Sequence, residues 1–302
     1  MIIFIGIFLL LLGGIAVGLW AMVVKSQTPK RIATNKTPDV PFRDIVIPNG
    51  NTKLRGWFIP ASSTEKQSPL IILVHGWGSG KTRMLRYVKP LYDAGYAILM
   101  FDVRSHGESD GDKAPTVKTF HDDIITAVQY ARQMKDIDPN RIVLLGHSFG
   151  AFGSIIANTK SLGIRALVTD SMPTRFRTIM EASLSHYKLP YFPLGPIISK
   201  MMFIRAGISK KQLKEFHVLE AMDHQKSPVL MIHSKNDNYV PPKDLAYLLD
   251  NHKVDGTKKS YLYVESKGHR SSETDPQFWP SVFEFLGRHV NVKENLVTNP
   301  ID

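Results

Sequence analysis

The sequence predicts an α/β fold with a mostly parallel central sheet and helices on both faces of that sheet. Short, continuous apolar runs occur at residues 70–74, 97–101, 142–145, 166–169 and 229–233. Such runs are typical of parallel strands that are buried on both faces. Longer amphipathic stretches, which predict helices, alternate with them at residues 82–94, 117–134, 151–161, 243–251 and 277–289. This alternation of strand and helix indicates a doubly wound sheet.

Residues 42–47 and 54–59 predict an opening hairpin across a turn at 48–51, and residues 261–264 predict the last strand. The chain has 302 residues, of which 43% are hydrophobic and 10% are aromatic. One large domain or two modest ones can bury a core at this length, and the composition excludes a disordered chain. Cysteine is absent, which excludes a disulfide scaffold, a Cys-ligated metal centre and a cysteine nucleophile.

The first residues predict one transmembrane helix. Residues 2–24 contain no charge and would form a helix of about 34 Å, long enough to cross a bilayer. A cleaved signal peptide is the alternative, but the apolar run is long for one and Val24-Lys25-Ser26 is a poor cleavage site. Basic residues follow the span, so the positive-inside rule places the body on the cytoplasmic side. They are Lys25, Lys30, Arg31, Lys36 and Arg43.

The predicted organisation has four parts. Residues 1–24 form the anchor, the proline-containing stretch 25–41 is a linker, residues 42–290 form the catalytic domain and residues 291–302 are a C-terminal tail. Residues 173–223 are far longer than a normal crossover between strands. An insertion of this size predicts a helical cap over the carboxyl ends of the strands.

The pattern G-x-S-x-G, which can mark a serine nucleophile, occurs twice. The copy centred on Ser148 follows the apolar run 142–145 and precedes small residues that open a helix, as the sharp turn of a nucleophile elbow requires. The copy centred on Ser109 has no strand immediately before it and no helix after it, and it predicts a solvated turn. Ser148 is therefore the predicted nucleophile.

Residues 76–82 imitate a phosphate-binding loop, because Gly76 and Gly80-Lys81-Thr82 follow a predicted strand. That loop needs four residues between its glycines so that its amides curl around the phosphate. Only three lie between Gly76 and Gly80. The spacing argues against nucleotide hydrolysis.

A serine nucleophile needs a base and a carboxylate that orients the base. Asp237 and His269 each follow a predicted strand, in the chain order expected for this type of sheet. Gly268 would let the backbone turn and project His269 over the sheet. His147, next to Ser148, is expected to point elsewhere. We expect the backbone N–H groups of Trp77 and Phe149 to form the oxyanion hole.

These segments together resemble the α/β-hydrolase superfamily, and within it the serine hydrolases of the monoacylglycerol-lipase and serine-aminopeptidase type. The resemblance extends over about two-thirds of the chain, although the family commonly has Gly where Ser105 stands and often Gly where Ala151 stands. It implies that residues 102–109 form a structural loop in which Asp102 and Arg104 pair. The matching residues are His75-Gly76-Trp77-Gly78, residues 102–109, Gly146-His147-Ser148-Phe149-Gly150, Asp237 with Val240-Pro241, and Gly268-His269.

The predicted function is that of a membrane-anchored serine hydrolase cleaving carboxylic esters, with lipid or acyl esters among the candidates. A peptidase or amidase of the same fold, and a non-catalytic membrane-anchored binding protein, remain alternatives. We expect no cofactor, no metal and no nucleic-acid partner; substrate, acyl-chain length and oligomeric state stay open.

The formal net charge is +11, and residues 173–220 hold eight basic residues against three acidic ones. Apolar residues are interleaved with them, so this predicted cap could lie against an anionic bilayer. Apolar residues that line a pocket, with charges that are merely solvated, are an equally good explanation of the pattern.

Overall fold

The computed structural model describes residues 1–63, 65–160, 162–252 and 258–290. The predicted tail, residues 291–302, and position 161 at the end of one predicted helix lie outside the described residues. In the described part the sheet has eight strands in the order β1-β2-β4-β3-β5-β6-β7-β8. The strands are β1 (Arg43–Asn49), β2 (Thr52–Ile59), β3 (Ser68–Val74), β4 (Ala97–Phe101), β5 (Ile137–His147), β6 (Ala166–Asp170), β7 (Val229–Ser234) and β8 (Lys259–Val264).

The sheet is mostly parallel, as predicted. β3 to β8 run parallel to their neighbours, whereas β1 and β2 form an antiparallel hairpin that pairs with β4. Asn49 pairs with Thr52, so a two-residue turn joins the hairpin, with Gly50 at φ +57°. Because β3 to β8 share one direction, the loops that follow them meet at one edge of the sheet.

Both faces of the sheet are covered. Alternate side chains of β3 and β4 pack on one face against α3 (Val117–Ala131) and α4 (Phe149–Asn158). The remaining side chains pack on the other face against α2 (Leu85–Asp93) and α10 (Phe278–Val290). Strands buried in this way need apolar side chains at every position, which explains their continuous apolar runs. α9 (Lys243–Asn251) lies on the α3 and α4 face.

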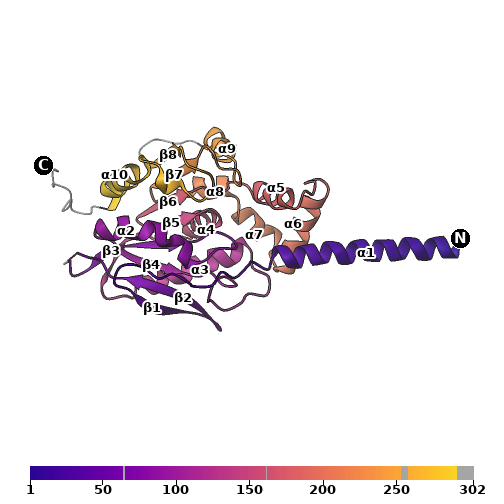
Figure 1. The fold of residues 1–302 in the computed structure, drawn as a ribbon, viewed down its shortest axis with the longest axis horizontal. Helices are drawn as coiled ribbons and strands as arrows, with labels where there is room; N and C mark the ends of the chain where they lie inside the picture. Colours follow the sequence, from indigo (N-terminus) through magenta and orange to yellow (C-terminus); the bar gives the residue numbers. More distant parts are fainter. Residues whose placement is uncertain (64, 161, 253–257, 291–302) are drawn as a thin grey trace.

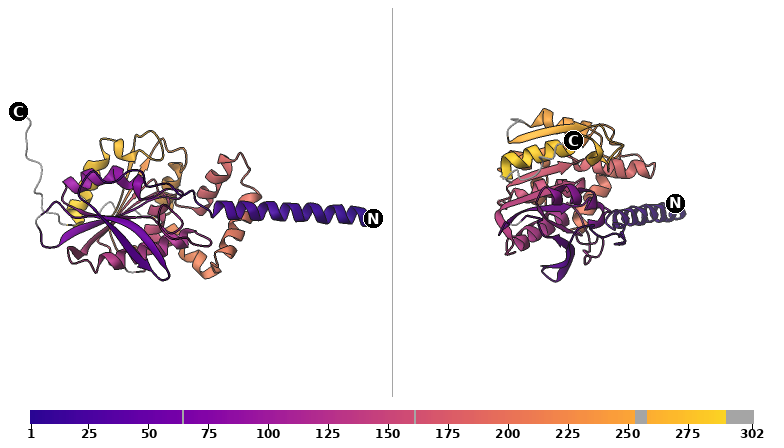
Figure 2. Two further views of the ribbon diagram at one scale, coloured as in Figure 1. Left: turned by 60° about the horizontal axis from the view of Figure 1, so that its bottom comes forward. Right: turned by 60° about the vertical axis from the view of Figure 1, so that its left-hand side comes forward.

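The long insertion after β6 is helical. It contains α5 (Phe176–His186), α6 (Leu194–Arg205), α7 (Lys210–Glu215) and α8 (Val218–Asp223). α8 packs against α4 in the main core, whereas α5 and α6 pack on each other at one end of the molecule. The two views of Figure 2 show α5 and α6 on the side from which the N-terminal helix leaves.

α1 (Ile2–Ser26) projects from the body as a long rod (Figure 1). By length and composition, residues 3–26, with a mean hydropathy of 2.6, meet the criteria for a membrane anchor or a signal sequence. Only the C-terminal end of α1 is packed. Val23 is fully buried against Met180, Leu184 and Met202 of the cap, and the Gln27 side chain donates to the main-chain oxygen of Met202 over 3.2 Å.

Candidate active site

Ser148 lies on a strained turn between β5 and α4. Its φ of +55° and ψ of −120° fall in a region that L-residues rarely adopt. A Cβ on Gly146 would lie 2.5 Å from the Cα of Ala151, and a Cβ on Gly150 would lie 2.4 Å from the main-chain oxygens of Val74 and His75. The flanking positions therefore accept only glycine, as a nucleophile elbow requires.

The structure brings together the three residues that the sequence placed after separate strands. His269 Nε2 lies 2.8 Å from Ser148 Oγ, and His269 Nδ1 lies 2.7 Å from Asp237 Oδ2. Gly268 has a φ of +122°, a conformation that glycine adopts readily, and this turn directs His269 toward Ser148. A hydroxyl, an imidazole and a carboxylate are thus joined by two hydrogen bonds.

Asp237 is held by its own loop. Its side chain is fully buried, and Oδ1 accepts hydrogen bonds from the backbone N–H groups of Tyr239 and Val240 over 2.9 and 2.8 Å. These bonds leave Oδ2 directed at His269 Nδ1. A carboxylate fixed in this way sets the orientation of the imidazole, so that His269 Nε2 faces the serine hydroxyl.

His147 does not contact the serine hydroxyl through a hydrogen bond. Its Nε2 lies 2.8 Å from the main-chain oxygen of His269, and because a carbonyl only accepts, Nε2 carries the hydrogen. Burial, together with the nearby charges of Arg86 and His269, lowers the pKa of His147 well below its ordinary value. His147 is therefore a neutral residue that positions the His269 segment, a role that the sequence pattern did not reveal.

The two expected oxyanion donors both belong to segments that adjoin Ser148. Phe149 is the first residue of α4, and Trp77 follows Gly76, where a Cβ would lie 3.1 Å from the Cβ of Ser148. Within the part of the chain that the structure describes, neither backbone N–H donates to another protein group. Both are free to bind an oxyanion.

His75 fixes the loop that carries Trp77. Its Nδ1–H donates to the main-chain oxygen of Gly76 over 2.8 Å, and its Nε2 accepts from the N–H of Val103 over 3.0 Å. Burial is the largest influence on this side chain and lowers its pKa. A neutral His75 thus ties the loop after β3 to the loop after β4 without adding a charge beneath the site.

The expected pairing of Asp102 with Arg104 is wrong. Asp102 instead accepts from Lys81 Nζ over 2.8 Å, and both side chains are buried, whereas Arg104 Nε pairs with Asp123 over 2.7 Å. Lys81 also contacts Glu108. The lysine of the apparent phosphate loop is thus a buried structural cation that ties two loops together.

The expectation of a solvated turn at Ser109 is also wrong. Ser109 is fully buried; its hydroxyl donates to the main-chain oxygen of Asp102 over 2.5 Å and accepts from the N–H of Arg55 over 2.8 Å. These bonds join the loop to β2. Ser109 therefore has a structural role, and it lies apart from His269.

Comparisons with known proteins agree with the fold. Residues 65–171 match the family model for serine aminopeptidases, S33. The esterase Pf2001 of Pyrococcus furiosus superposes with a TM-score of 0.69 at 24% identity, covering 87% of this chain and 99% of that one. The chain has the α/β-hydrolase fold.

Curated relatives match a smaller share of this chain than the Pyrococcus furiosus esterase does. The quorum-quenching protein AidA of Acinetobacter baumannii is 31% identical over 142 residues, which are 46% of this chain and 46% of AidA. The protein YqkD of Bacillus subtilis is 27% identical over 248 residues, which are 80% of this chain and 78% of YqkD. The chain spans about half the length of the first curated relatives it matches.

Two cavities of the protein meet at Ser148. One is a cleft of about 420 Å³ whose lining is mainly polar and basic. The other is a pocket of about 70 Å³ lined mostly by apolar side chains of the cap and of α4. Ser148, Trp77 and Tyr239 line both cavities, so a molecule bound at Ser148 can extend into each of them.

The apolar pocket is built in part by the N-terminal helix. Ser26, the last residue of α1, lines this pocket together with Phe149 of α4 and cap residues that include Phe176, Ile179 and Met202. No pattern in the sequence connects residue 26 with residue 148. The contact arises because the buried end of α1 docks on α5 and α6.

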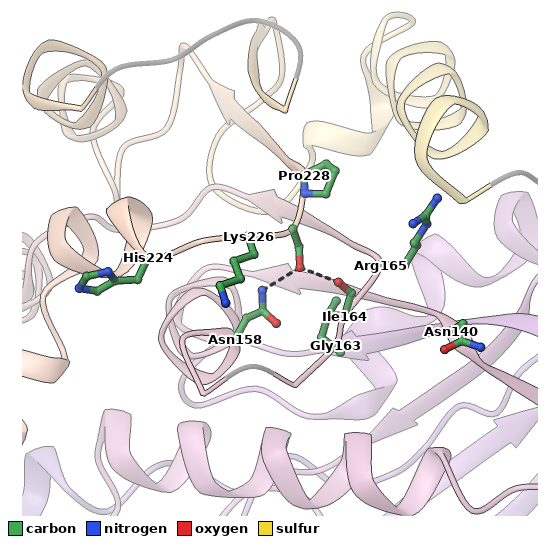
Figure 3. Close-up of a pocket in the computed structure, with 9 residues that line it drawn as sticks. Asn140, Asn158, Gly163, Ile164, Arg165, His224, Lys226 and Pro228 are labelled. Atoms are coloured by element: carbon green, nitrogen blue, oxygen red, sulfur yellow. Dashed lines mark hydrogen bonds between the residues drawn. The ribbon is translucent and has the colours of Figure 1, made fainter.

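Another hollow, of about 430 Å³, lies at the opposite edge of the sheet (Figure 3). It is lined near the start of β6 and β7 by residues that include Asn158, Ile164 and Arg165. Asn158 donates to Ser227 Oγ over 3.1 Å, and Ser227 donates to the main-chain oxygen of Ile164 over 2.5 Å. These polar groups connect α4 to the strands, and the hollow is remote from Ser148.

Proposed function

We propose that this α/β-hydrolase is a membrane-tethered serine hydrolase that cleaves carboxylic esters of apolar acyl chains. The observation that carries the proposal is the pair of hydrogen bonds from Ser148 Oγ to His269 Nε2 and from His269 Nδ1 to Asp237 Oδ2. The esterase fold neighbours support the same class of reaction.

The proposed reaction has two steps. Ser148 Oγ attacks the ester carbonyl while His269 Nε2 accepts the hydroxyl proton, and Asp237 stabilises the imidazolium that forms. The N–H groups of Phe149 and Trp77 stabilise the oxyanion. His269 then gives the proton to the leaving alcohol, and the C–O bond breaks to leave an acyl group on Ser148. Water, activated by His269, releases the acid.

The apolar pocket supports an acyl substrate. Its walls include Phe149, Phe176, Ile179 and Met202, which offer no charge to a bound group. Transfer of a methylene group from water into such surroundings contributes about 0.8 kcal/mol. An acyl chain of a few carbons therefore gains affinity from this pocket, with its carbonyl beside Ser148.

The surroundings of α1 support a bilayer as the source of that substrate. The cap exposes large apolar side chains where α1 leaves the body: Tyr187, Phe192 and Ile204 are 55%, 79% and 67% exposed. Lys188 and Lys200 lie among them in the sequence. Apolar groups interleaved with cations suit the interface of an anionic membrane. The body is proposed to lie on the cytoplasmic side.

The test is turnover of p-nitrophenyl butyrate and labelling by a fluorophosphonate, with the full chain in detergent. Ser148→Ala is expected to lower kcat by about 10⁴–10⁶-fold and to abolish labelling. Ser79→Ala, which alters another serine of the cleft, is the matched control and should be labelled as wild type is. Near wild-type turnover by Ser148→Ala would overturn the proposal.

Amide hydrolysis is a second candidate function, because the matching family model is that of serine aminopeptidases. A butyryl ester and the corresponding butyryl amide of one chromogenic group would discriminate between them. We expect the ester to be cleaved and the amide to be a poor substrate. Faster cleavage of an aminoacyl amide than of any ester would favour the peptidase.

Membrane attachment is tested separately, by fractionation of cells that produce the full chain. The protein should remain in the membrane pellet after alkaline carbonate extraction, because a single apolar span resists it. Protease added to intact cells should leave the body uncut. Release of a shortened, soluble protein would identify α1 as a cleaved signal sequence.

A further inference from the structure

The two cavities at Ser148 differ in chemical character. The apolar pocket suits the acyl chain of a substrate, so the leaving alcohol must occupy the cleft on the other side of Ser148. The side chains that line the cleft therefore indicate the chemistry of the leaving alcohol and not that of the acyl group. This reasoning rests on the proposed function of Ser148.

The cleft is basic. Arg83, Arg86, Lys267 and Arg270 line it, and none of the described residues that line it is acidic. These side chains come from two regions far apart in the sequence: the 3-10 turn at Lys81–Met84 with the first turn of α2, and the loop after β8. They lie together because of the fold, and not because they form a cluster of charge in the sequence.

Arg86 is already neutralised. It lies 3.8 Å from Asp170 and 3.4 Å from Glu273, and it donates to the Tyr87 hydroxyl over 2.7 Å. It also donates to the main-chain oxygen of Arg270 over 3.3 Å. Arg86 therefore stabilises the loop after β8, and the binding of an anionic ligand in the cleft would depend on the other three cations.

Arg83, Lys267 and Arg270 have no ion pair within the described residues. Partial burial and the neighbouring charges of Arg83 and Arg86 lower the pKa of Arg270. Like charges that face one cleft repel each other, and an anion bound between them relieves the repulsion. Arginine is well suited to a planar or tetrahedral oxyanion, because its fork of donors binds two oxygens.

We propose that Arg83, Arg270 and Lys267 bind an anionic oxyacid group on the alcohol side of the substrate. The substrate class is then an acyl ester whose leaving alcohol carries a phosphate or a carboxylate. The scissile bond remains the acyl C–O bond, and the alcohol departs with its phosphate or carboxylate intact and with the proton from His269.

The test compares three substrates with one acyl chain: 1-hexanoylglycerol 3-phosphate, 1-hexanoylglycerol, and the hexanoyl ester of 3-hydroxypropanoic acid. With the full chain in detergent at low salt, we expect kcat/KM for the phosphate ester to exceed that for the neutral ester about tenfold, mainly through KM. The preference should fall as salt rises, because these cations are exposed. The third substrate shows whether carboxylate replaces phosphate.

Arg270→Gln and the double variant Arg83→Gln/Arg270→Gln should bring the ratio of anionic to neutral kcat/KM toward one, and Arg270→Lys should retain part of it. Lys135→Gln, which removes one exposed charge before β5 at the other edge of the sheet, is the matched control and should keep the wild-type ratio. A wild-type ratio of one or below, or a ratio that the double variant leaves unchanged, overturns the inference. Absence of turnover on all three esters together with absence of labelling at Ser148 would instead overturn the proposed function.

Discussion

The Nε2–H of His147 donates to the main-chain oxygen of His269 over 2.8 Å, so the residue beside Ser148 holds the segment that carries His269. The two rings also lie with their centroids 4.9 Å apart. Ser148 and His269 are thereby held together through His147 as well as through their own hydrogen bond.

His147→Ala should lower kcat by up to about 10²-fold, because a small misplacement of a catalytic group has an effect of this size. KM should change less than kcat, since His147 lines the cleft on the alcohol side but not the acyl pocket. Steady-state turnover of the butyrate ester measures both constants. His224→Ala, an exposed histidine at the other edge of the sheet, should retain wild-type kcat. An unaltered kcat in His147→Ala would remove its positioning role.

Gly150→Ala should destabilise the protein by about 1–3 kcal/mol or more, because the new methyl would lie 2.4 Å from two main-chain oxygens. Gly287→Ala is the matched change in another helix, where nothing lies within 4 Å. There, the higher helix propensity of alanine should stabilise the protein by about 0.5–1 kcal/mol. Denaturant unfolding of the two variants should give opposite signs, and equal signs would contradict the packing described at the elbow.

Lys81→Met should lower the free energy of unfolding by about 3–5 kcal/mol, because it leaves the buried Asp102 without its cation. Lys89→Met removes an exposed pair with Asp93 and should cost less than about 1 kcal/mol. Burial acts to raise the pKa of Asp102, but His75, Lys81 and hydrogen bonds outweigh it and lower that pKa.

The pH dependence of this effect follows from the direction of the shift. A lowered carboxyl pKa contributes stability above the unfolded value of about 3.9, and the contribution is lost as the pH falls through the folded pKa. The cost of Lys81→Met should therefore be full at pH 7 and shrink below about pH 4. If the loss of unfolding free energy caused by Lys81→Met stays constant down to pH 3, the Lys81–Asp102 ion pair is not the cause of that loss.

Stability should fall as the pH drops below about 6.5. Burial is the main cause that lowers the pKa of His106 to about 3, and the neighbouring imidazole of His75 adds to the effect. Between the unfolded pKa of about 6.5 and this value, the unfolded chain binds a proton that the folded chain does not, which costs about 1.4 kcal/mol per pH unit. His106→Gln should reduce the slope of unfolding free energy against pH by this amount, and denaturant unfolding at several pH values between 4 and 7 measures that slope.

Much of the site followed from local sequence signals. Ser148 could be predicted because its elbow demands small neighbours, and Asp237 and His269 because each follows a predicted strand. The loop after β3, which carries Trp77, was predicted by the same reasoning. These features depend on residues close to strand ends, where a short sequence pattern fixes the local backbone.

Features that depend on distant contacts could not be predicted. Asp102 pairs with Lys81 rather than Arg104, because the loops after β3 and β4 meet only in the folded sheet. Ser109 is buried for the same reason. The cations of the cleft are Arg83 and the distant Lys267 and Arg270, whereas the charge pattern of the sequence drew attention to the cap.

The docking of α1 has a consequence for any shortened form of the protein. Val23 fills a socket among Met180, Leu184, Ile198 and Met202, and Ser26 closes one side of the acyl pocket. Removing the helix would open that socket to water, beside the apolar pocket that reaches Ser148. The segment that we propose as the membrane anchor thus also covers an apolar surface of the body, and we expect a truncated protein to need detergent or lipid in its place.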